Sequence, residues 1–353
     1  MKVGFITGRD DEVYDDEYLL SMTPKKYLVQ GNYEKPLLHT DVAIAMTVKD
    51  SYPDVSVDII QPKDITNQRL RKNDVNFILG YDCINQLIQE PYVRKFSGEK
   101  GYKLLHSIYS QPQNKVFPPM NFLEFIWAKD KYMKTFQRKQ IPVSDTLFVS
   151  KPSTPKLLRD IQQKQWKEFI IKPVGGTVAI GVGRFKTKEC LQNPRIITEY
   201  FDEYSPTYSK FLVQELIRGF KTYGEIKMFW INEEYSYAVN TIDKGGGDQD
   251  QYSVSQMKQS PTLEACQKIG KQALQALPKI KVKGKHVKPV LVRTDFTCCK
   301  ENKSKSPSNY FLNEVEHQDA GSYANYYEVK YPYVQIMADA FVKKAQELIS
   351  LGF

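Results

Sequence analysis

The chain has 353 residues, of which 41% are hydrophobic and 12% aromatic, a composition that supports buried cores and excludes intrinsic disorder. This length predicts two or three domains. The formal net charge of +9 favours an anionic ligand, and nucleotides, phosphorylated metabolites, nucleic acids and membrane surfaces all satisfy it. The five scattered cysteines form no C-x-x-C pair, so we expect free thiols in a reducing compartment rather than disulfides or a zinc site.

The hydrophobic segments of the sequence are short. No apolar run approaches the ~18 residues of a membrane span. The N-terminus has the pattern of a strand and lacks that of a secretory signal. These features predict a protein of the cytoplasm with no membrane partner.

Apolar periodicity predicts an alternation of strands and helices. In chain order, the predicted strands cover 2–7, 55–60, 75–79, 146–149, 169–171, 211–217, 224–231, 235–242, 287–297 and 310–315. The predicted helices cover 36–52, 81–89, 121–139, 155–165, 263–277 and 334–350. Residues 196–200 are a short mixed run of apolar and polar residues with no assigned structure. The order predicts an α/β (α+β) protein with a small open α/β domain over residues 1–120.

Two turns of this first domain are candidate ligand contacts. Ligands of open α/β sheets lie beyond the carboxyl ends of the strands. Gly8–Asp10, which includes Arg9, and Gly80–Asp82 follow predicted strands at that edge. The alternative is that both are ordinary turns between a strand and a helix.

The segment 169–185, FIIKPVGGTVAIGVGRF, has the features of a phosphate-binding loop. Lys172 leaves an apolar strand, and glycines follow at Gly175, Gly176, Gly181 and Gly183. Glycines let backbone N–H groups approach phosphate oxygens, and the lysine supplies a compact positive charge. The lysine precedes the glycines, which excludes a Walker A loop, and no G-x-G-x-x-G opens a helix. The alternative is a β-hairpin with a glycine-rich tip.

A basic stretch over 279–288, KIKVKGKHVK, is a candidate for contact with nucleic acid. No aromatic residue lies among its lysines, although base stacking requires one. We therefore predict a solvated turn that leads into a strand.

Two predicted strands carry acids on one face. Side chains two apart in a strand share a face. Arg293 and Asp295 therefore point to the same side of one strand, and Glu314 and Glu316 to the same side of the other. Pairing of the strands through a hairpin at 299–309 would bring three carboxylates and an arginine together. Buried like charges require a cation, and oxygen ligands favour Mg²⁺, which also takes phosphate oxygens. The alternative is a solvent-facing sheet with alternating charges.

In this order along the chain, these motifs resemble the ATP-grasp superfamily, with similarity to D-alanine–D-alanine ligases and glutathione synthetases. The resemblance covers residues 121–321. It includes the helix around Lys129 and Lys131, the lysine strand with its glycine loop, the FLVQELI strand before Gly219, and the two acidic strands. It implies an N-terminal domain over 1–120, a lid subdomain over 121–218 and a C-terminal subdomain with the metal site over 219–353.

The resemblance implies a role for each matching residue. Lys131 and Lys172 would hold the α- and β-phosphates, with Lys129 as a less favoured replacement for Lys131. The loop with Gly175, Gly176 and Gly181 would cover the phosphates. The adenine and ribose contacts would come from Gln214, Glu215, Leu216, Ile217 and Glu225.

The remaining implied roles concern phosphoryl transfer. Asp295, Glu314 and Glu316 would bind Mg²⁺ or Mn²⁺. Lys172, Lys227 and Arg293 would act on the transferred phosphoryl group. Many members have Asn at the position of Glu316. The segment 317–321 replaces a Ser-Pro-Gly stretch of the dipeptide ligases, which speaks against that activity. His317 is either a base or a solvent-facing loop residue.

The implied activity is an ADP-forming ligase that uses ATP and Mg²⁺. It would convert a small-molecule carboxylate to an acylphosphate and couple it to an amine. No nucleic acid takes part, and the resemblance allows a homodimer. Two alternatives remain open: a kinase acting on a small anionic metabolite, like the inositol phosphate kinases of this fold, and a non-catalytic ATP-binding protein, as the resemblance to synapsins allows. The sequence does not name the substrates.

Overall fold

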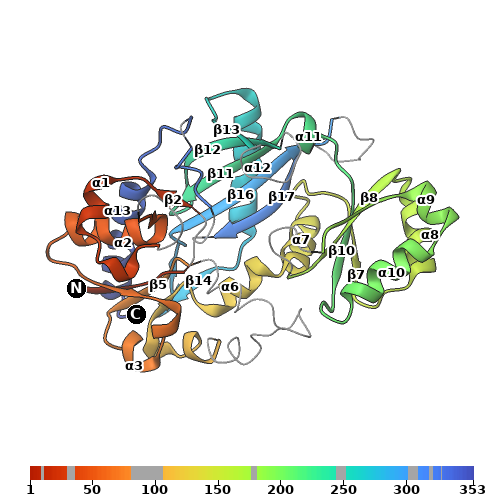
Figure 1. The fold of residues 1–353 in the computed structure, drawn as a ribbon. Helices are drawn as coiled ribbons and strands as arrows, with labels where there is room; N and C mark the ends of the chain where they lie inside the picture. The colour runs from red at the N-terminus through yellow and green to blue at the C-terminus, as the bar shows by residue number, and fades with distance from the viewer. Residues whose placement is uncertain are drawn as a thin grey trace.

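The structure is a computed structural model that describes residues 1–8, 12–29, 36–80, 106–175, 181–243, 252–300, 309–317, 321–326 and 328–353. Three sheets of four or five strands follow one another across the molecule, and two short two-stranded ribbons accompany them. Figure 1 shows the N-terminal sheet at the left, the C-terminal sheet in the middle and the remaining sheet at the right. Helices and strands are mixed throughout, as the predicted α/β (α+β) class requires.

The N-terminal sheet is parallel and has the strand order β4-β1-β5-β6. Its strands are β1 (Lys2–Ile6), β4 (Ser56–Ile60), β5 (Val75–Ile78) and β6 (Val116–Phe117). Successive side chains of β1 enter different cores, Phe5 on one face and Ile6 on the other. Both faces are therefore covered, which explains the nearly continuous apolar sequence of these strands.

Two helices from opposite ends of the chain cover one face of this sheet. These are α2 (Thr40–Ser51) and the C-terminal helix α13 (Tyr333–Ser350), which contact each other. Phe341 of α13 lies edge-on to Phe5, with ring centres 5.7 Å apart, and 4.8 Å from Phe77. The N-terminal sheet consequently shares its core with the C-terminal part of the chain.

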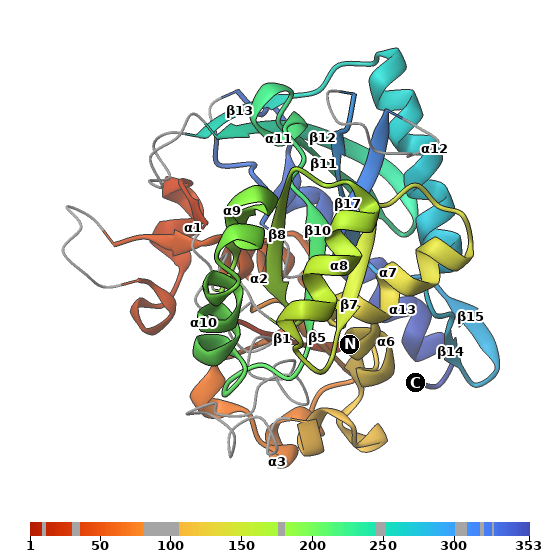
Figure 2. The ribbon, with the colours of Figure 1, turned by 90° about the vertical axis from the view of Figure 1, so that its right-hand side faces the viewer.

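The second sheet is antiparallel and has the order β7-β10-β8-β9. Its elements are β7 (Thr146–Val149), α8 (Thr154–Lys164), β8 (Glu168–Pro173), β9 (Gly183–Lys186), α9 (Thr187–Gln192), α10 (Arg195–Tyr204) and β10 (Phe211–Glu215). The three helices lie together in front of the sheet in Figure 2. They share with it a hydrophobic cluster separate from the large one. We call this unit the lid.

The third sheet is antiparallel and has the order β13-β12-β11-β16-β17. Its strands are β11 (Glu225–Ile231), β12 (Glu234–Asp243), β13 (Tyr252–Gln256), β16 (Leu291–Cys298) and β17 (Tyr310–His317). Helix α12 (Pro261–Ala276) packs on it, with Gly270 against Trp230. The short helix α11 (Gly219–Thr222) connects the lid to this sheet.

The predicted helix over 121–139 is two helices, α6 (Met120–Trp127) and α7 (Lys129–Arg138). Ala128 separates them with a non-helical ψ of 80°. Apolar residues of both helices, among them Phe122 and Phe136, belong to the large core and not to the lid cluster. The break makes Lys129 the first residue of α7.

Two further segments differ from the sequence-based expectation. The mixed run over 196–200 lies within α10, which buries Ile197, Tyr200 and Phe201 at helical spacing. The basic stretch forms a hairpin of β14 (Ile280–Val282) and β15 (Lys285–Val287), with apolar side chains buried and most of its lysines exposed.

The remaining short elements are β2 (Val13–Tyr14), α1 (Glu17–Met22), η1 (Lys25–Tyr27), β3 (Leu38–His39), η2 (Pro62–Asp64), α3 (Asn67–Leu70) and η3 (Pro112–Asn114). The predicted helix start at 81–89, the loop at 244–251 and most of the 299–309 hairpin lie outside the described residues. Four cysteines, Cys190, Cys266, Cys298 and Cys299, are free and buried. Among the helices described, none combines the length and apolar character that a membrane crossing requires.

Candidate active site

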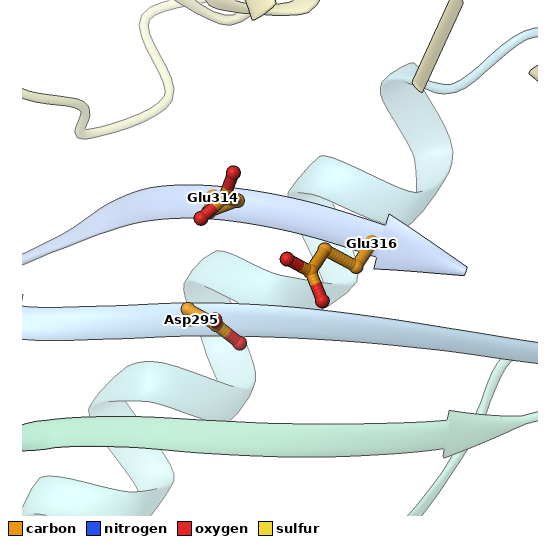
Figure 3. Close-up of side chains that lie close together, drawn as sticks. All are labelled: Asp295, Glu314 and Glu316. Carbon is orange, nitrogen blue, oxygen red and sulfur yellow. The ribbon is translucent and has the colours of Figure 1, made fainter. Parts of the chain in front are cut away.

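The neighbouring strands β16 and β17 bring three carboxylates together. Asp295 lies opposite Glu314, and Arg293 lies opposite Glu316. Ligand oxygens of Asp295, Glu314 and Glu316 all lie within 4.8 Å of one another. Figure 3 shows the three side chains on the same side of the two strands. The predicted convergence of the acids, which we call the acid cluster, is therefore present.

Two buried cations on β16 and β11 hold the acid cluster. Arg293 donates from Nε to Asp295 Oδ1 at 2.8 Å and from Nη2 to Asp295 Oδ2 at 2.9 Å. The same Nη2 lies 2.5 Å from Glu316 Oε2. Lys227 donates to Asp295 Oδ2 at 3.0 Å and to Glu225 Oε2 at 2.6 Å. Asp295 is thus bound by both cations before any ligand is considered.

A third cation comes from the start of α7. Lys129 Nζ lies 2.5 Å from Glu314 Oε1. Lys131, two residues later and therefore about 200° around the helix, is exposed to solvent. The lysine that faces the acid cluster is consequently Lys129, whereas the resemblance to the ATP-grasp superfamily favours Lys131 for the phosphates. The break at Ala128, which the sequence pattern did not reveal, sets this direction.

The lid contributes the fourth cation, Lys172 on β8. Burial, together with the charge of Lys129, lowers the pKa of Lys172 to about 8. Glu314 and Glu225 act on the same ammonium group and oppose this shift. These mutual effects place the lid lysine within electrostatic reach of the acids of the third sheet.

The acids respond unequally to this environment. Burial alone would raise the pKa of Glu314, but the charges of Lys129 and Lys172 lower it to about 2. For Glu316, burial and the neighbouring Glu314 and Asp295 outweigh Arg293 and raise the pKa to about 7. A carboxyl group that ionises with difficulty in a cluster of acids is suited to bind a further cation.

The acid cluster fits a hard divalent cation. Its ligand atoms are all carboxylate oxygens, the type that Mg²⁺ and Mn²⁺ accept, and Mg²⁺ takes a few carboxylates together with phosphate oxygens and water. Four acids (Glu225, Asp295, Glu314 and Glu316) and four bases (Lys129, Lys172, Lys227 and Arg293) make up the site. Their formal charges cancel, so a metal ion that binds together with an anion would disturb this balance less than either one alone.

The predicted adenine-contacting residues lie at the end of β10 and just beyond it. Gln214 is buried, and its amide donates to Thr146 Oγ1 at 2.8 Å. The Leu216 N–H donates to the carbonyl of Glu168 at 3.0 Å. Ile217 is buried with Phe311 in a small cluster. These contacts attach the strand end to β7 and β8, and the side chain of Glu215 beside it is partly exposed.

The glycine loop begins and ends in backbone conformations that favour glycine. Gly175 has a φ of 113° and Gly181 a φ of 73°. A Cβ on Gly181 would come within 2.7 Å of Pro173, and Tyr200 donates to the Gly181 carbonyl at 2.6 Å. Gly176 lies outside the described residues. Both described ends of the loop, Gly175 after β8 and Gly181 before β9, thus have backbone geometry that favours glycine.

Glu225 and His317 complete the comparison with the sequence-based roles. The Asn313 amide donates to Glu225 Oε1 at 2.8 Å, so Glu225 lies between Asn313 and Lys227. His317 is buried at the end of β17 beside the rings of Phe122 and Trp127. Burial lowers the pKa of His317 to about 3, which makes it a neutral core residue at neutral pH. The expectation of a solvent-facing loop residue is therefore wrong, and the role of a base stays a prediction.

The two N-terminal turns approach each other at the carboxyl end of their sheet. A Cβ on Gly80 would lie 2.3 Å from the backbone nitrogen of Gly8. The Gly8 N–H donates to Asp41 Oδ2 at 2.8 Å. The residues that would contact a ligand there, Arg9, Asp10, Tyr81 and Asp82, lie outside the described residues.

Two residues near the acid cluster escaped the sequence analysis. Tyr323 lies over the cations Lys227 and Arg293, and Glu12 binds the backbone beside it. Neither belongs to a recognisable motif, and Glu12 is more than 300 positions away from its partners. A sequence pattern carries no signal for such a contact.

Comparison with known proteins supports the fold. No family model and no curated protein matches the sequence. Among solved structures, the D-cycloserine synthetase DcsG is similar at a TM-score of 0.65 and 12% identity, covering 98% of this chain and 100% of its own. D-alanine–D-alanine ligase from Bacillus anthracis complexed with ATP gives 0.60 and 13%, with both chains covered in full. The ATP-grasp ligase PsnB complexed with Mg and ADP gives 0.58 and 10%, covering 98% of each chain. The predicted architecture is confirmed: the chain has the ATP-grasp fold.

Proposed function

We propose that the protein is an ADP-forming ligase that activates a carboxylate with ATP and couples it to an amine. The γ-phosphoryl group would pass to a carboxylate oxygen, giving ADP and an acylphosphate. An amine would then attack the acyl carbon and release inorganic phosphate. The observation that supports this most directly is the acid cluster with four cations around it, drawn from the lid, from α7 and from the third sheet.

The cations would bind the phosphate chain. We assign the α- and β-phosphates to Lys129 and Lys172, with Lys129 in place of Lys131 because Lys129 faces the acids. Arg293 and Lys227 would orient the γ-phosphoryl group and neutralise its charge during transfer. Positioned positive charge is the main requirement of this reaction, which needs no covalent protein nucleophile.

Magnesium would be held by Asp295, Glu314 and Glu316, where it would reduce the negative charge of the phosphates. The nucleoside would lie between the lid and the third sheet. Backbone groups at Glu215 and Leu216 would face the adenine, with Gln214 and Ile217 supporting that strand end. Glu225 would accept a hydrogen bond from a ribose hydroxyl. The loop with Gly175, Gly176 and Gly181 would cover the phosphates.

Product analysis tests this proposal. The protein is incubated with ATP, Mg²⁺ and pooled amino acids, carboxylic acids and polyols, and ADP and inorganic phosphate are both quantified. A ligase gives equal amounts of ADP and phosphate that depend on an acid and an amine. ADP with no free phosphate would show a kinase, and the absence of ADP in every pool would show an ATP-binding protein without catalysis.

A further inference from the structure

In the segment after β17, residues 321–326, an aromatic ring lies beside two of the cations that bind the acid cluster. The ring centre of Tyr323 lies 5.7 Å from Lys227 Nζ and 5.9 Å from Arg293 Cζ, within the range of cation–π attraction. The carbonyl of Gly321 accepts a hydrogen bond from Arg293 Nη1 at 3.1 Å. The position of this segment therefore helps to fix the direction of the Arg293 guanidinium.

Tyr323 adopts a backbone conformation that a bulky residue rarely takes. Its φ is 57°, in the left-handed region, which is unfavourable for an L-residue with a side chain. Such strain persists where surrounding contacts hold the residue in place, and it is found most often at functional sites. The contacts of the 321–326 segment therefore indicate what holds it.

One carboxylate binds the strained turn from a distant part of the chain. Glu12 Oε2 accepts from the Ser322 N–H at 2.8 Å and from Ser322 Oγ at 2.6 Å. Glu12 Oε1 accepts from the Tyr323 N–H at 2.7 Å. Hydrogen bonds to a charged acceptor are stronger than those between neutral groups, so these three bonds can offset the strain at Tyr323. On the other side of the turn, Tyr237 donates to the Ser322 carbonyl at 2.7 Å.

Glu12 is itself fixed to the N-terminal domain. Its carbonyl accepts from the backbone N–H of Thr40, the first residue of α2, at 3.2 Å. The chain of contacts thus runs from α2 through Glu12 and the 321–326 segment to Arg293. We propose that Glu12 is a positioning residue, which holds the segment so that Gly321 and Tyr323 orient Arg293 at the acid cluster. This inference rests on the proposed function for its catalytic meaning, but its structural part does not.

The Arg293 Nε–H resonance tests the structural part in solution. This group is buried and bonded to Asp295, so it should give a slowly exchanging signal in the ¹⁵N spectrum of the free protein, assigned with Arg293→Lys. Glu12→Gln keeps the length of the side chain but replaces one acceptor oxygen with an NH₂ group that faces an N–H donor. We expect the Arg293 Nε–H to exchange with water roughly tenfold faster in this variant. An unchanged exchange rate in a folded Glu12→Gln protein would overturn the proposal.

Asp16→Asn is the matched control. Asp16 belongs to the same N-terminal segment, and its carboxylate accepts from the Leu19 N–H at 2.9 Å at the start of α1. The substitution is of the same kind, a carboxylate replaced by an amide, but the hydrogen-bond partner lies away from the acid cluster. We expect no change at Arg293 in this variant. A similar acceleration in both variants would contradict the positioning role, because it would show that Glu12 only supports the fold in general.

If Glu12→Gln does not fold, Ser322→Ala is the second variant. It removes one of the three hydrogen bonds to Glu12 and should change the exchange rate in the same direction by a smaller factor.

Turnover tests the catalytic part. We expect Glu12→Gln to lower kcat about tenfold while the KM for ATP stays within twofold, because Glu12 contacts neither lysine of the phosphate site. A wild-type protein that binds no nucleotide would contradict the proposed function and leave the Arg293 result standing. Wild-type turnover with an unchanged kcat in Glu12→Gln would contradict the positioning role and leave the proposed function standing.

Discussion

Lys172 is a side chain whose charge depends on its surroundings near physiological pH. Burial and Lys129 lower its pKa to about 8, whereas a bound phosphate would favour the ammonium form and raise it again. Nucleotide affinity should therefore be full below pH 8 and fall as the pH rises through 8, by up to about tenfold per pH unit. Calorimetric titration with a non-hydrolysable ATP analogue and Mg²⁺ between pH 7 and 9.5 measures this. Lys172→Arg keeps its charge over the whole range and should abolish the slope; an equal slope in both proteins would refute the assignment.

The assignment of Lys129 over Lys131 is tested by a pair of matched variants. Lys129 lies against Glu314, while Lys131 is exposed on the same helix. Lys129→Ala should weaken Mg²⁺-ATP binding about tenfold or more, and Lys131→Ala should change it less than twofold. Lys129→Ala should also raise the affinity for Mn²⁺ alone, because a competing cation has been removed from Glu314. Equal losses in the two variants would show that the ion pair has no part in nucleotide binding.

At the scale of elements, the pairing of β16 with β17 creates the metal-binding face. Glu314→Gln preserves the size of the side chain but removes its charge and one of its two acceptor oxygens. ATP binding without metal should persist, while the gain in affinity on adding Mg²⁺ should be lost and turnover should fall at least a hundredfold. Glu234→Gln, at an exposed acid of β12, is the control. A Glu314→Gln protein with full Mg²⁺-dependent turnover would remove Glu314 from the metal site.

The sequence predicted these strands because their patterns are local. Alternation in VLVRTDF places Arg293 and Asp295 on one face, and alternation in FLNEVE does the same for Glu314 and Glu316, while β16 and β17 are consecutive strands that pair directly. Helix α10 was missed because a ten-residue helix beside a proline and several acids resembles a loop, although its buried residues recur at helical spacing. The direction of Lys129 could not be predicted, because it depends on the backbone break at Ala128. Contacts of high sequence separation, such as that of Glu12, leave no local pattern.

In the molecule as a whole, the hydrophobic clusters do not follow the order of the chain. The N-terminal and third sheets share the large core with α6, α7 and α13, whereas the lid has its own cluster. Because residues of α6 and α7 pack in the large core, we infer that the lid starts near β7 rather than at residue 121. A lid with a core largely of its own suits a site that would close over a nucleotide.

This division predicts separate responses to core mutations. Phe341→Ala removes a ring that packs on Phe5 and Phe77 and should destabilise the large core by about 3–5 kcal/mol. Hydrogen exchange should then accelerate in β1, β5 and α2 and stay unchanged in β8 and β10. Phe201→Ala, in the lid cluster, should give the opposite pattern. Acceleration throughout the chain in both variants would show that the two cores unfold as one unit.

In the function proposed above, Lys129, Lys172 and the acid cluster together bind ATP and magnesium. The most direct test is calorimetric titration of the wild-type protein with a non-hydrolysable ATP analogue, with and without Mg²⁺. We predict one nucleotide per chain, an affinity that Mg²⁺ raises at least tenfold, and little binding of Mg²⁺ when the nucleotide is absent. Absence of nucleotide binding at millimolar concentration, or an affinity that Mg²⁺ leaves unchanged, would contradict it.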